Sequence, residues 1–162
     1  MKDDSNKFFS EDTQTVIVMC GLPRSGKTTY VKEHFQDYVR VSMDDIVAST
    51  TQTFNMKFGA FYTKIENLMI KELVKKGANF VIDRTSLTKK SRLRTKNKIL
   101  KAAIQAGRKR PVLKLVVIST NMEICITRNI KTQKVPKGVF INMARSFECP
   151  DIDEGWDEII YT

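Results

Sequence analysis

The chain has 162 residues, of which 28 are Lys or Arg, 18 are Asp or Glu and 41% are hydrophobic. This length and composition are typical of one globular domain with its own core, and no apolar run approaches the roughly 20 residues of a membrane-spanning helix. Cysteines occur only at positions 20, 125 and 149, without a C-x-x-C pair, which argues against a disulfide framework and a zinc site. His34 is the only histidine, so His-based catalysis and His-based metal sites are not expected.

The first twelve residues are polar except for Met1, Phe8 and Phe9 and lack the apolar core of a signal peptide. We expect residues 1–12 to form a flexible N-terminal segment, with the two phenylalanines packed on the sheet. Residues 13–162 are expected to form a single domain, and the protein is expected in the cytoplasm with reduced thiols.

The positive charge is concentrated in the second half of the chain. Residues 1–80 carry 11 basic and 10 acidic side chains, whereas residues 81–162 carry 17 basic and 8 acidic ones. Residues 84–122 contain no acidic residue at all. Such a basic segment indicates either a nucleic-acid-binding surface or a solvated helix face.

The most informative stretch is residues 21–29, which has the pattern G-x-x-x-x-G-K-[ST] between an apolar run at 15–20 and a potential helix. Glycines allow the backbone N–H groups to converge on phosphate oxygens, and the following helix adds its dipole. Lys27 is expected to contact the β- and γ-phosphates, and the Thr28 hydroxyl to ligate Mg²⁺. We therefore expect a nucleoside triphosphate with Mg²⁺ to bind this loop, which consists of Gly21, Leu22, Pro23, Arg24, Ser25, Gly26, Lys27, Thr28 and Thr29.

The rest of the chain alternates between strand and helix patterns. Strands are expected at 15–20, 38–41, 79–83, 112–118 and 158–161, the last at an edge of the sheet. A helix is expected to follow the glycine loop within residues 21–35. Further helices are expected to start at 42 and 120 and to cover 60–76, 88–105 and 139–147. The core-facing positions are predicted to be Phe61, Ile65, Leu68, Met69 and Leu73 in one helix and Leu93, Asn97, Leu100 and Ile104 in the next. This order predicts an α/β three-layer sandwich with a parallel sheet of about five strands.

Two carboxylates are expected at the carboxyl edge of that sheet, where ligands bind. Ser42 is a candidate N-cap with Asp45 as its reciprocal partner, which leaves Asp44 free to accept a proton from an attacking hydroxyl. The alternative is that both aspartates only complement the helix dipole. Asp83 ends a strand and is expected either to orient Mg²⁺ and its waters or to cap the following helix.

A basic connection is expected near the end of the chain. Residues 120–123 form a capping box that starts a helix carrying Arg128. Residues 130–138 are expected to form a flexible lid whose cations, Lys131 and Lys134, close over the triphosphate.

Four blocks resemble the kinase domain of 5′-hydroxyl polynucleotide kinases and related small P-loop kinases. They are GLPRSGKTT at 21–29, VSMDD at 41–45, VIDRTS at 81–86 with Ser91 and Arg92, and RN, VP, FECP and EGWDEI between 128 and 159. The resemblance implies a nucleotide kinase-like P-loop NTPase fold. It also implies that Asp44 is the general base for a 5′-hydroxyl, that Lys27 binds phosphates, that Thr28 and Asp83 serve the metal, and that Arg128 begins the lid.

The chain departs from the family pattern on the acceptor side. Met43 and Val47 stand where the family or its phage member has arginine, Ser86 replaces an asparagine, and the lid is shorter. Arg84 and Arg92, in the basic segment, are the candidate acceptor-binding side chains beside Asp83.

Three functions are therefore compatible with the sequence. The first is an ATP- and Mg²⁺-dependent kinase acting on the 5′-hydroxyl of DNA or RNA, with single-stranded ends as the expected partner and no protein partner predicted. The second is a small-molecule kinase for a sugar, nucleoside or antibiotic. The third is a nucleotide-dependent nucleic-acid-binding module that transfers no phosphate.

Overall fold

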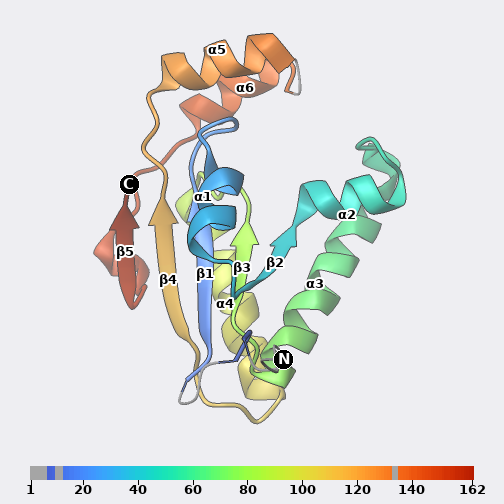
Figure 1. Ribbon diagram of the computed structural model, residues 1–162, viewed down its shortest axis with the longest axis vertical. Coiled ribbons are helices and arrows are strands. Elements are labelled where there is room, and N and C mark those ends of the chain that lie inside the picture. The colour runs from blue at the N-terminus through green and yellow to red at the C-terminus, as the bar shows by residue number, and fades with distance from the viewer. Residues whose placement is uncertain (1–6, 10–12, 133–134) are drawn as a thin grey trace, which may run out of the picture.

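The computed structural model of the protein describes residues 7–9, 13–132 and 135–162. Its centre is a five-stranded parallel sheet in the order β2-β3-β1-β4-β5 (Figure 1). The strands are β1 (Thr15–Cys20), β2 (Val39–Ser42), β3 (Phe80–Asp83), β4 (Val112–Val117) and β5 (Glu158–Tyr161). All five expected strands are confirmed, and β5 lies at an edge.

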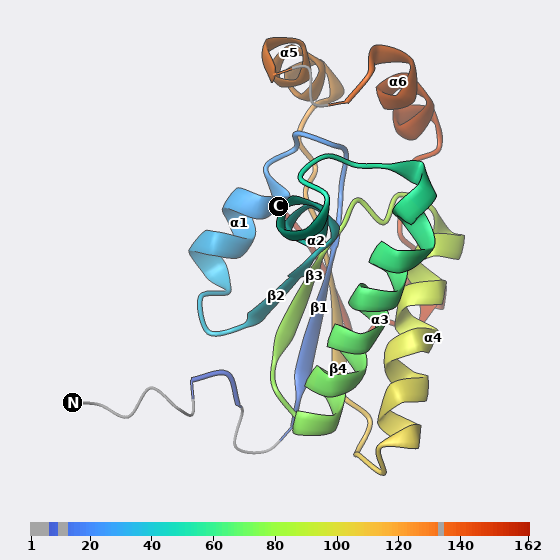
Figure 2. The ribbon, with the colours of Figure 1, turned by 90° about the vertical axis from the view of Figure 1, so that its right-hand side faces the viewer.

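Helices cover both faces of the sheet. Figure 2 shows α1 on one face and α3 and α4 on the other, which confirms the three-layer α/β sandwich. The helices are α1 (Lys27–His34), α2 (Met43–Thr50), α3 (Gly59–Lys76), α4 (Lys89–Gln105), α5 (Met122–Thr132) and α6 (Lys137–Arg145), with 3₁₀ turns η2 (Met56–Phe58) and η3 (Ile152–Glu154). No helix in the described ranges is both long enough and apolar enough to cross a membrane.

The register of the sheet brings the expected functional residues to one edge. Strand β1 lies between β3 and β4, and its carboxyl end leads directly into residues 21–26. Ser42 at the end of β2 is paired with Asp83 at the end of β3. Because the strands are parallel, the loop after β1, the start of α2 and Asp83 share the same edge.

The buried faces of the two long helices differ from the prediction. Phe61 and Leu68 of α3 are 46% and 52% exposed, and Ile104 of α4 is 80% exposed. Asn97 of α4 is exposed as well, whereas four of the predicted positions are partly buried against the core: Ile65, Met69, Leu73 and Leu100. The buried residues are Tyr62, Glu66, Ile70 and Val74 in α3 and Arg92, Thr95, Ile99, Ala102 and Ala103 in α4. The centre of each buried face lies about one residue from the predicted one and includes a charged side chain, Glu66 or Arg92, which the apolar pattern could not indicate because each is buried as a member of an ion pair.

Part of the expected flexible N-terminal segment pairs with the residues just before β3, although Phe9 is 44% exposed and not packed in the core as a phenylalanine on the sheet would be. Phe9 forms an isolated antiparallel bridge with Ala78, and the N–H of Asn79 donates to the carbonyl of Phe8 at 2.7 Å. Residues 1–6 and 10–12 of that segment lie outside the described residues.

Candidate functional site

The loop between β1 and α1 adopts a conformation that suits a phosphate group. Gly21, Arg24 and Gly26 all have positive φ, at 152°, 65° and 102°. A side chain on Gly21 would meet the Ile118 carbonyl oxygen at 2.9 Å, so only glycine fits there. The Lys27 ammonium group donates to the carbonyls of Gly21 and Leu22 at 3.0 and 2.7 Å, which holds it across the loop.

Polar groups of this loop lack partners within the described chain. The Ser25 hydroxyl and the Arg24 Nε are buried without a hydrogen bond. Gly26 caps α1 without a side-chain bond to the first amides of the helix. Orphan donors at a helix N-terminus are the groups that bind a phosphate, so these residues fit the triphosphate of ATP.

Thr28, Asp83 and Arg40 form a hydrogen-bonded group beside the loop. The Thr28 hydroxyl donates to Asp83 Oδ2 at 2.8 Å, and Arg40 Nε donates to the same oxygen at 2.9 Å. The Asp83 side chain is only 4% exposed. Thr88, rather than Asp83, caps α4, because its hydroxyl accepts the Ser91 N–H at 3.1 Å. A hydroxyl and a carboxylate are oxygen donors of the kind that Mg²⁺ prefers, so Thr28 and Asp83 fit the metal.

Asp44 begins α2 at the same edge and has no hydrogen-bonded or ionic partner among the described residues. Ser42 caps α2 by accepting the Asp45 N–H at 3.4 Å. The Asp45 carboxylate, expected to bond back to Ser42, instead contacts Arg40, so that half of the capping box was wrong. Asp44 is exposed. Burial lowers the pKa of Lys27, and the charges of Asp83 and Asp44 partly oppose that shift.

The segment after β4 holds the phosphate loop from above. The Thr120 hydroxyl donates to the Ser25 carbonyl at 2.6 Å, and Arg128 Nη1 donates to the Arg24 carbonyl at 3.1 Å. Thr120 was expected to cap α5, but Asn121 takes that role by accepting the Glu123 N–H at 2.7 Å. Arg128 therefore contacts the loop directly.

The expected lid is largely helical. Helices α5 and α6 stand together beyond the carboxyl end of the sheet, next to the phosphate loop (Figure 1). The Asn129 side chain ties α5 to the segment just before α6 by bonds to the N–H and carbonyl of Val135, at 3.1 and 2.7 Å. Lys131 is exposed in the last turn of α5, so residues 130–132 are helix rather than flexible connection. Lys134 lies outside the described residues.

The two candidate acceptor-binding arginines have different surroundings. Arg84 pairs with the buried Glu66 at 3.2 Å and keeps 38% of its side chain exposed. Arg92 is fully buried and binds both carboxylate oxygens of Glu154, at 2.8 and 2.5 Å. Its Nη1 donates to the carbonyls of Ser86 and Leu87. Because no part of Arg92 reaches the surface, the geometry removes it from the acceptor-binding set.

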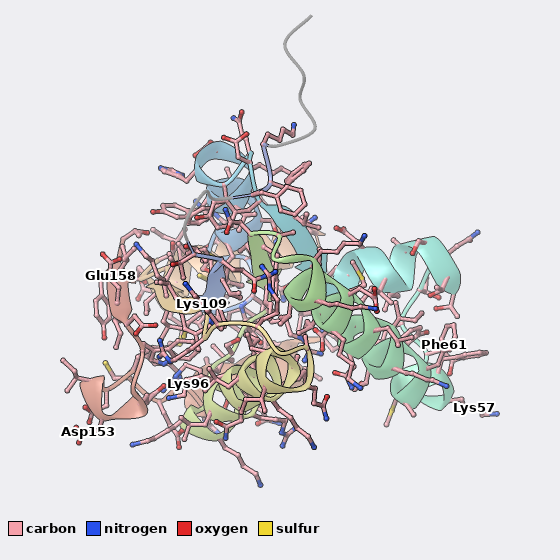
Figure 3. The ribbon with its side chains drawn as sticks, turned by 90° about the horizontal axis from the view of Figure 1, so that it is seen from below. Lys57, Phe61, Lys96, Lys109, Asp153 and Glu158 are labelled. Atoms are coloured by element: carbon pink, nitrogen blue, oxygen red, sulfur yellow. The ribbon has the colours of Figure 1, made fainter. Side chains whose placement is uncertain are left out.

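The basic segment is not a single charged surface. Six of its side chains bond to carboxylates or carbonyls of the chain: Arg84, Arg92, Lys96, Lys98, Arg110 and Lys114. The residues that follow α4 lie below the sheet, at the end opposite the phosphate loop, as Lys109 shows in Figure 3. Lys89 and Lys90, in the first turn of α4, are exposed and lie toward the edge that carries Asp83.

Arg40 is the site residue that sequence reasoning missed. Its guanidinium group contacts Asp83, Asp45 and Ser42 and so joins β3 to the start of α2. The only available signal was a basic residue within the short strand at 38–41, and its partner Asp83 lies 43 residues further along the chain.

Comparisons with known proteins agree with this geometry. A family model described as an AAA domain matches residues 16–150. L-seryl-tRNA(Sec) kinase of Methanococcus maripaludis is 23% identical over 149 residues, which cover 88% of this chain and 56% of that protein. The chain thus spans little more than half the length of this curated relative.

Solved structures share the fold at low identity. A chain of the Pnkp1/Rnl/Hen1 RNA repair complex matches with a TM-score of 0.70 and 18% identity, covering 85% of this chain and 45% of that one. A gluconokinase from Sinorhizobium meliloti matches with a TM-score of 0.56 and 16% identity, covering 92% and 82%. The resemblance to the kinase domain of polynucleotide kinases is confirmed at the level of the fold. With a family match over most of its length and an intact phosphate-binding loop, the chain belongs to the AAA domain family.

Proposed function

We propose that the protein transfers the γ-phosphoryl group of ATP, with Mg²⁺, to the 5′-hydroxyl end of DNA or RNA. The observation that carries this proposal is the Asp44 carboxylate, which is exposed and without a bonded partner in the described chain at the edge that holds the phosphate loop. A carboxylate in that position accepts the proton of an attacking hydroxyl.

Each remaining residue of the site has a role in this transfer. Lys27 and the N–H groups of the loop bind the phosphates, and Thr28 with Asp83 supplies oxygen donors for the metal. Bound Mg²⁺·ATP supplies the phosphoryl group and charge neutralisation. Arg128 holds the loop through the Arg24 carbonyl, and Lys131 is the described lid cation nearest in sequence to it.

A nucleic-acid acceptor is supported by the relatives and by the exposed cations at the site edge. One relative is an L-seryl-tRNA(Sec) kinase, and one structural neighbour belongs to an RNA repair complex. Arg84 follows Asp83 directly and is partly exposed, and Lys89 and Lys90, in the first turn of α4, are exposed. Cations there attract the phosphates next to a 5′ end.

A small-molecule acceptor is the second candidate. Half of the twelve basic residues between 84 and 114 bond within the chain, which reduces the surface charge available to a polyanion. The gluconokinase match shows that the same fold occurs in a sugar kinase. A module that binds nucleotide and nucleic acid without transfer is the third candidate.

An acceptor panel separates these candidates. The full chain is incubated with γ-labelled ATP and Mg²⁺, together with a single-stranded 5′-hydroxyl oligonucleotide, the same strand with a 5′-phosphate, or a set of sugars and nucleosides. We expect label only on the 5′-hydroxyl strand, and less of it as salt rises. Label on a sugar or nucleoside alone establishes the second candidate, and ATP binding without any labelled product establishes the third.

Arg40 is expected to control the metal requirement of the reaction. Its guanidinium group donates to the same Asp83 oxygen that accepts the Thr28 hydroxyl. A positive charge at this position repels a nearby divalent cation. Arg40→Gln is therefore expected to lower the Mg²⁺ concentration for half-maximal rate roughly three- to ten-fold, measured by titrating Mg²⁺ at saturating ATP. An Arg40 that only stabilises the fold leaves that concentration unchanged.

A further inference from the structure

The corner between α2 and α3 exposes aromatic side chains that the transfer chemistry does not use. Phe54, Phe58 and Phe61 are 65%, 44% and 46% exposed. Their ring centroids lie 5.7, 6.3 and 6.1 Å from that of Tyr62, and Phe58 meets Phe61 edge to face at 6.1 Å. These four residues form a single cluster, called here the aromatic platform.

The platform is built on a fixed anchor. Tyr62 is fully buried, and its hydroxyl bonds to the Thr51 hydroxyl at 2.5 Å and accepts the Asn55 N–H at 3.3 Å. The Asn55 side chain in turn caps η2 by accepting the Lys57 N–H at 3.0 Å. These bonds tie the loop between α2 and α3 to the first turn of α3, so the exposed rings stand on an ordered support.

The platform follows the helix whose first turn carries the proposed base. Helix α2 has eight residues, about 12 Å of length, and leads from Asp44 to the corner. Figure 1 shows this corner toward the end of the sheet that carries the phosphate loop, and Figure 3 shows Phe61 and Lys57 pointing outward from it. A strand with its 5′ end at Asp44 reaches the platform within a few nucleotides.

The charges around the platform fit a polyanion. No acidic residue occurs between Asp45 and Glu66, whereas Lys57 and Lys64 are exposed in that interval. Exposed aromatic rings flanked by cations are the arrangement that binds single strands, because each base offers a π-face for stacking and each phosphate a negative charge.

We propose that the aromatic platform stacks unpaired bases of the acceptor strand, a few nucleotides from the 5′-hydroxyl. The inference rests on the proposed function for the identity of that strand. It adds that the substrate is single-stranded at this distance from its end, since paired bases have no free face to stack. It also adds that affinity depends on bases as well as on phosphates.

The test compares a base-bearing strand with an abasic strand of equal length and charge, both labelled with a fluorophore, by anisotropy without ATP. Wild-type protein is expected to bind the base-bearing strand at least about ten-fold more tightly. The double variant Phe58→Leu/Phe61→Leu keeps apolar side chains but removes two rings, and it is expected to lose that preference. Ile104→Ala, an exposed apolar residue of α4 outside the site, is the matched control and is expected to keep it.

A second variant gives a direct signal of stacking. Phe58→Trp keeps an aromatic ring at a half-exposed position, and its fluorescence is expected to be quenched by the base-bearing strand and not by the abasic one. Trp156 is 7% exposed and provides a constant background. Three outcomes would each contradict the proposed stacking. They are equal binding of both strands by wild type, full preference retained by the leucine variant, and no quenching of the tryptophan variant.

Failure of the platform and failure of the proposed function are distinguishable. Binding is measured without ATP, whereas transfer is measured on wild type with the same strand. Base-dependent binding without transfer supports stacking on the platform and contradicts the proposed 5′-hydroxyl kinase activity. Transfer with equal affinity for both strands supports the kinase activity and contradicts stacking on the platform.

Discussion

Replacing Asp44 by asparagine is expected to lower the rate of phosphoryl transfer about 10²- to 10⁴-fold, because the amide cannot accept the proton of the attacking hydroxyl. The Asp44 carboxylate is exposed, and Ser42 rather than Asp44 caps α2, so the fold does not depend on this side chain. The measurement is kcat for a 5′-hydroxyl oligonucleotide with Mg²⁺·ATP. The affinity for ATP, measured separately, is expected to change little.

Asp45→Asn is the matched control for this experiment. It removes the same charge one residue further along the same helix, from a side chain that is 60% exposed and paired with Arg40. A much smaller loss of kcat is expected, since the Asp45 carboxylate is paired with Arg40 and does not serve as the proton acceptor. Equal losses in the two variants would mean that charge at the start of α2, rather than proton transfer at Asp44, supports the reaction.

Replacing Glu154 by glutamine is expected to destabilise the protein by about 3–5 kcal/mol, because it leaves the charge of Arg92 buried and unpaired. Both side chains are fully buried, and Glu154 also accepts from the Trp156 indole at 3.0 Å. For a domain of this size the loss corresponds to a fall in melting temperature of roughly 6–20 °C. Urea unfolding and thermal melting measure it.

Glu158→Gln provides the same chemical change at a half-exposed pair with Lys114 and is expected to cost at most about 1 kcal/mol. Equal stability of the Glu154 variant and wild type would contradict the role of the buried pair.

The Glu154 effect also has a defined dependence on pH. Burial alone raises the pKa of Glu154, but hydrogen bonds from Arg92 and Trp156 outweigh it and hold the pKa below the ordinary value of 4.5. The stabilisation by the ionised carboxylate is therefore complete above pH 4.5 and is lost as the pH falls through the lowered value in the folded state. Wild type and Glu154→Gln are expected to converge in stability as the pH is lowered through that window.

Arg92 shows why part of the site was not predictable from the sequence. It was assigned to the acceptor because it lies in a basic segment and in a block that resembles the polynucleotide kinases. Its partner Glu154 is 62 residues away, and nothing local to either residue indicates the pair. The same holds for Arg40 with Asp83 and for Arg84 with Glu66, whose ion pairs join separate elements of the fold.

The sequence by itself determined the parts of this protein that depend on local patterns. The glycine loop with Lys27, the five strands and the parallel α/β order all follow from residue spacing and from short flanking segments. The placement of Asp44 and Asp83 at one edge follows as well, because carboxyl ends of parallel strands lie together.

Only the tertiary structure decided which faces of α3 and α4 are buried and which basic side chains remain exposed. It alone revealed that Arg40 holds Asp83 and that three phenylalanines gather around Tyr62 at the corner of α2 and α3. The physical reason is that burial and ion pairing are settled between segments distant in the chain. A helix with apolar residues on several sides buries the face that its neighbours complement, and a charged side chain enters the core only where a partner from another element neutralises it.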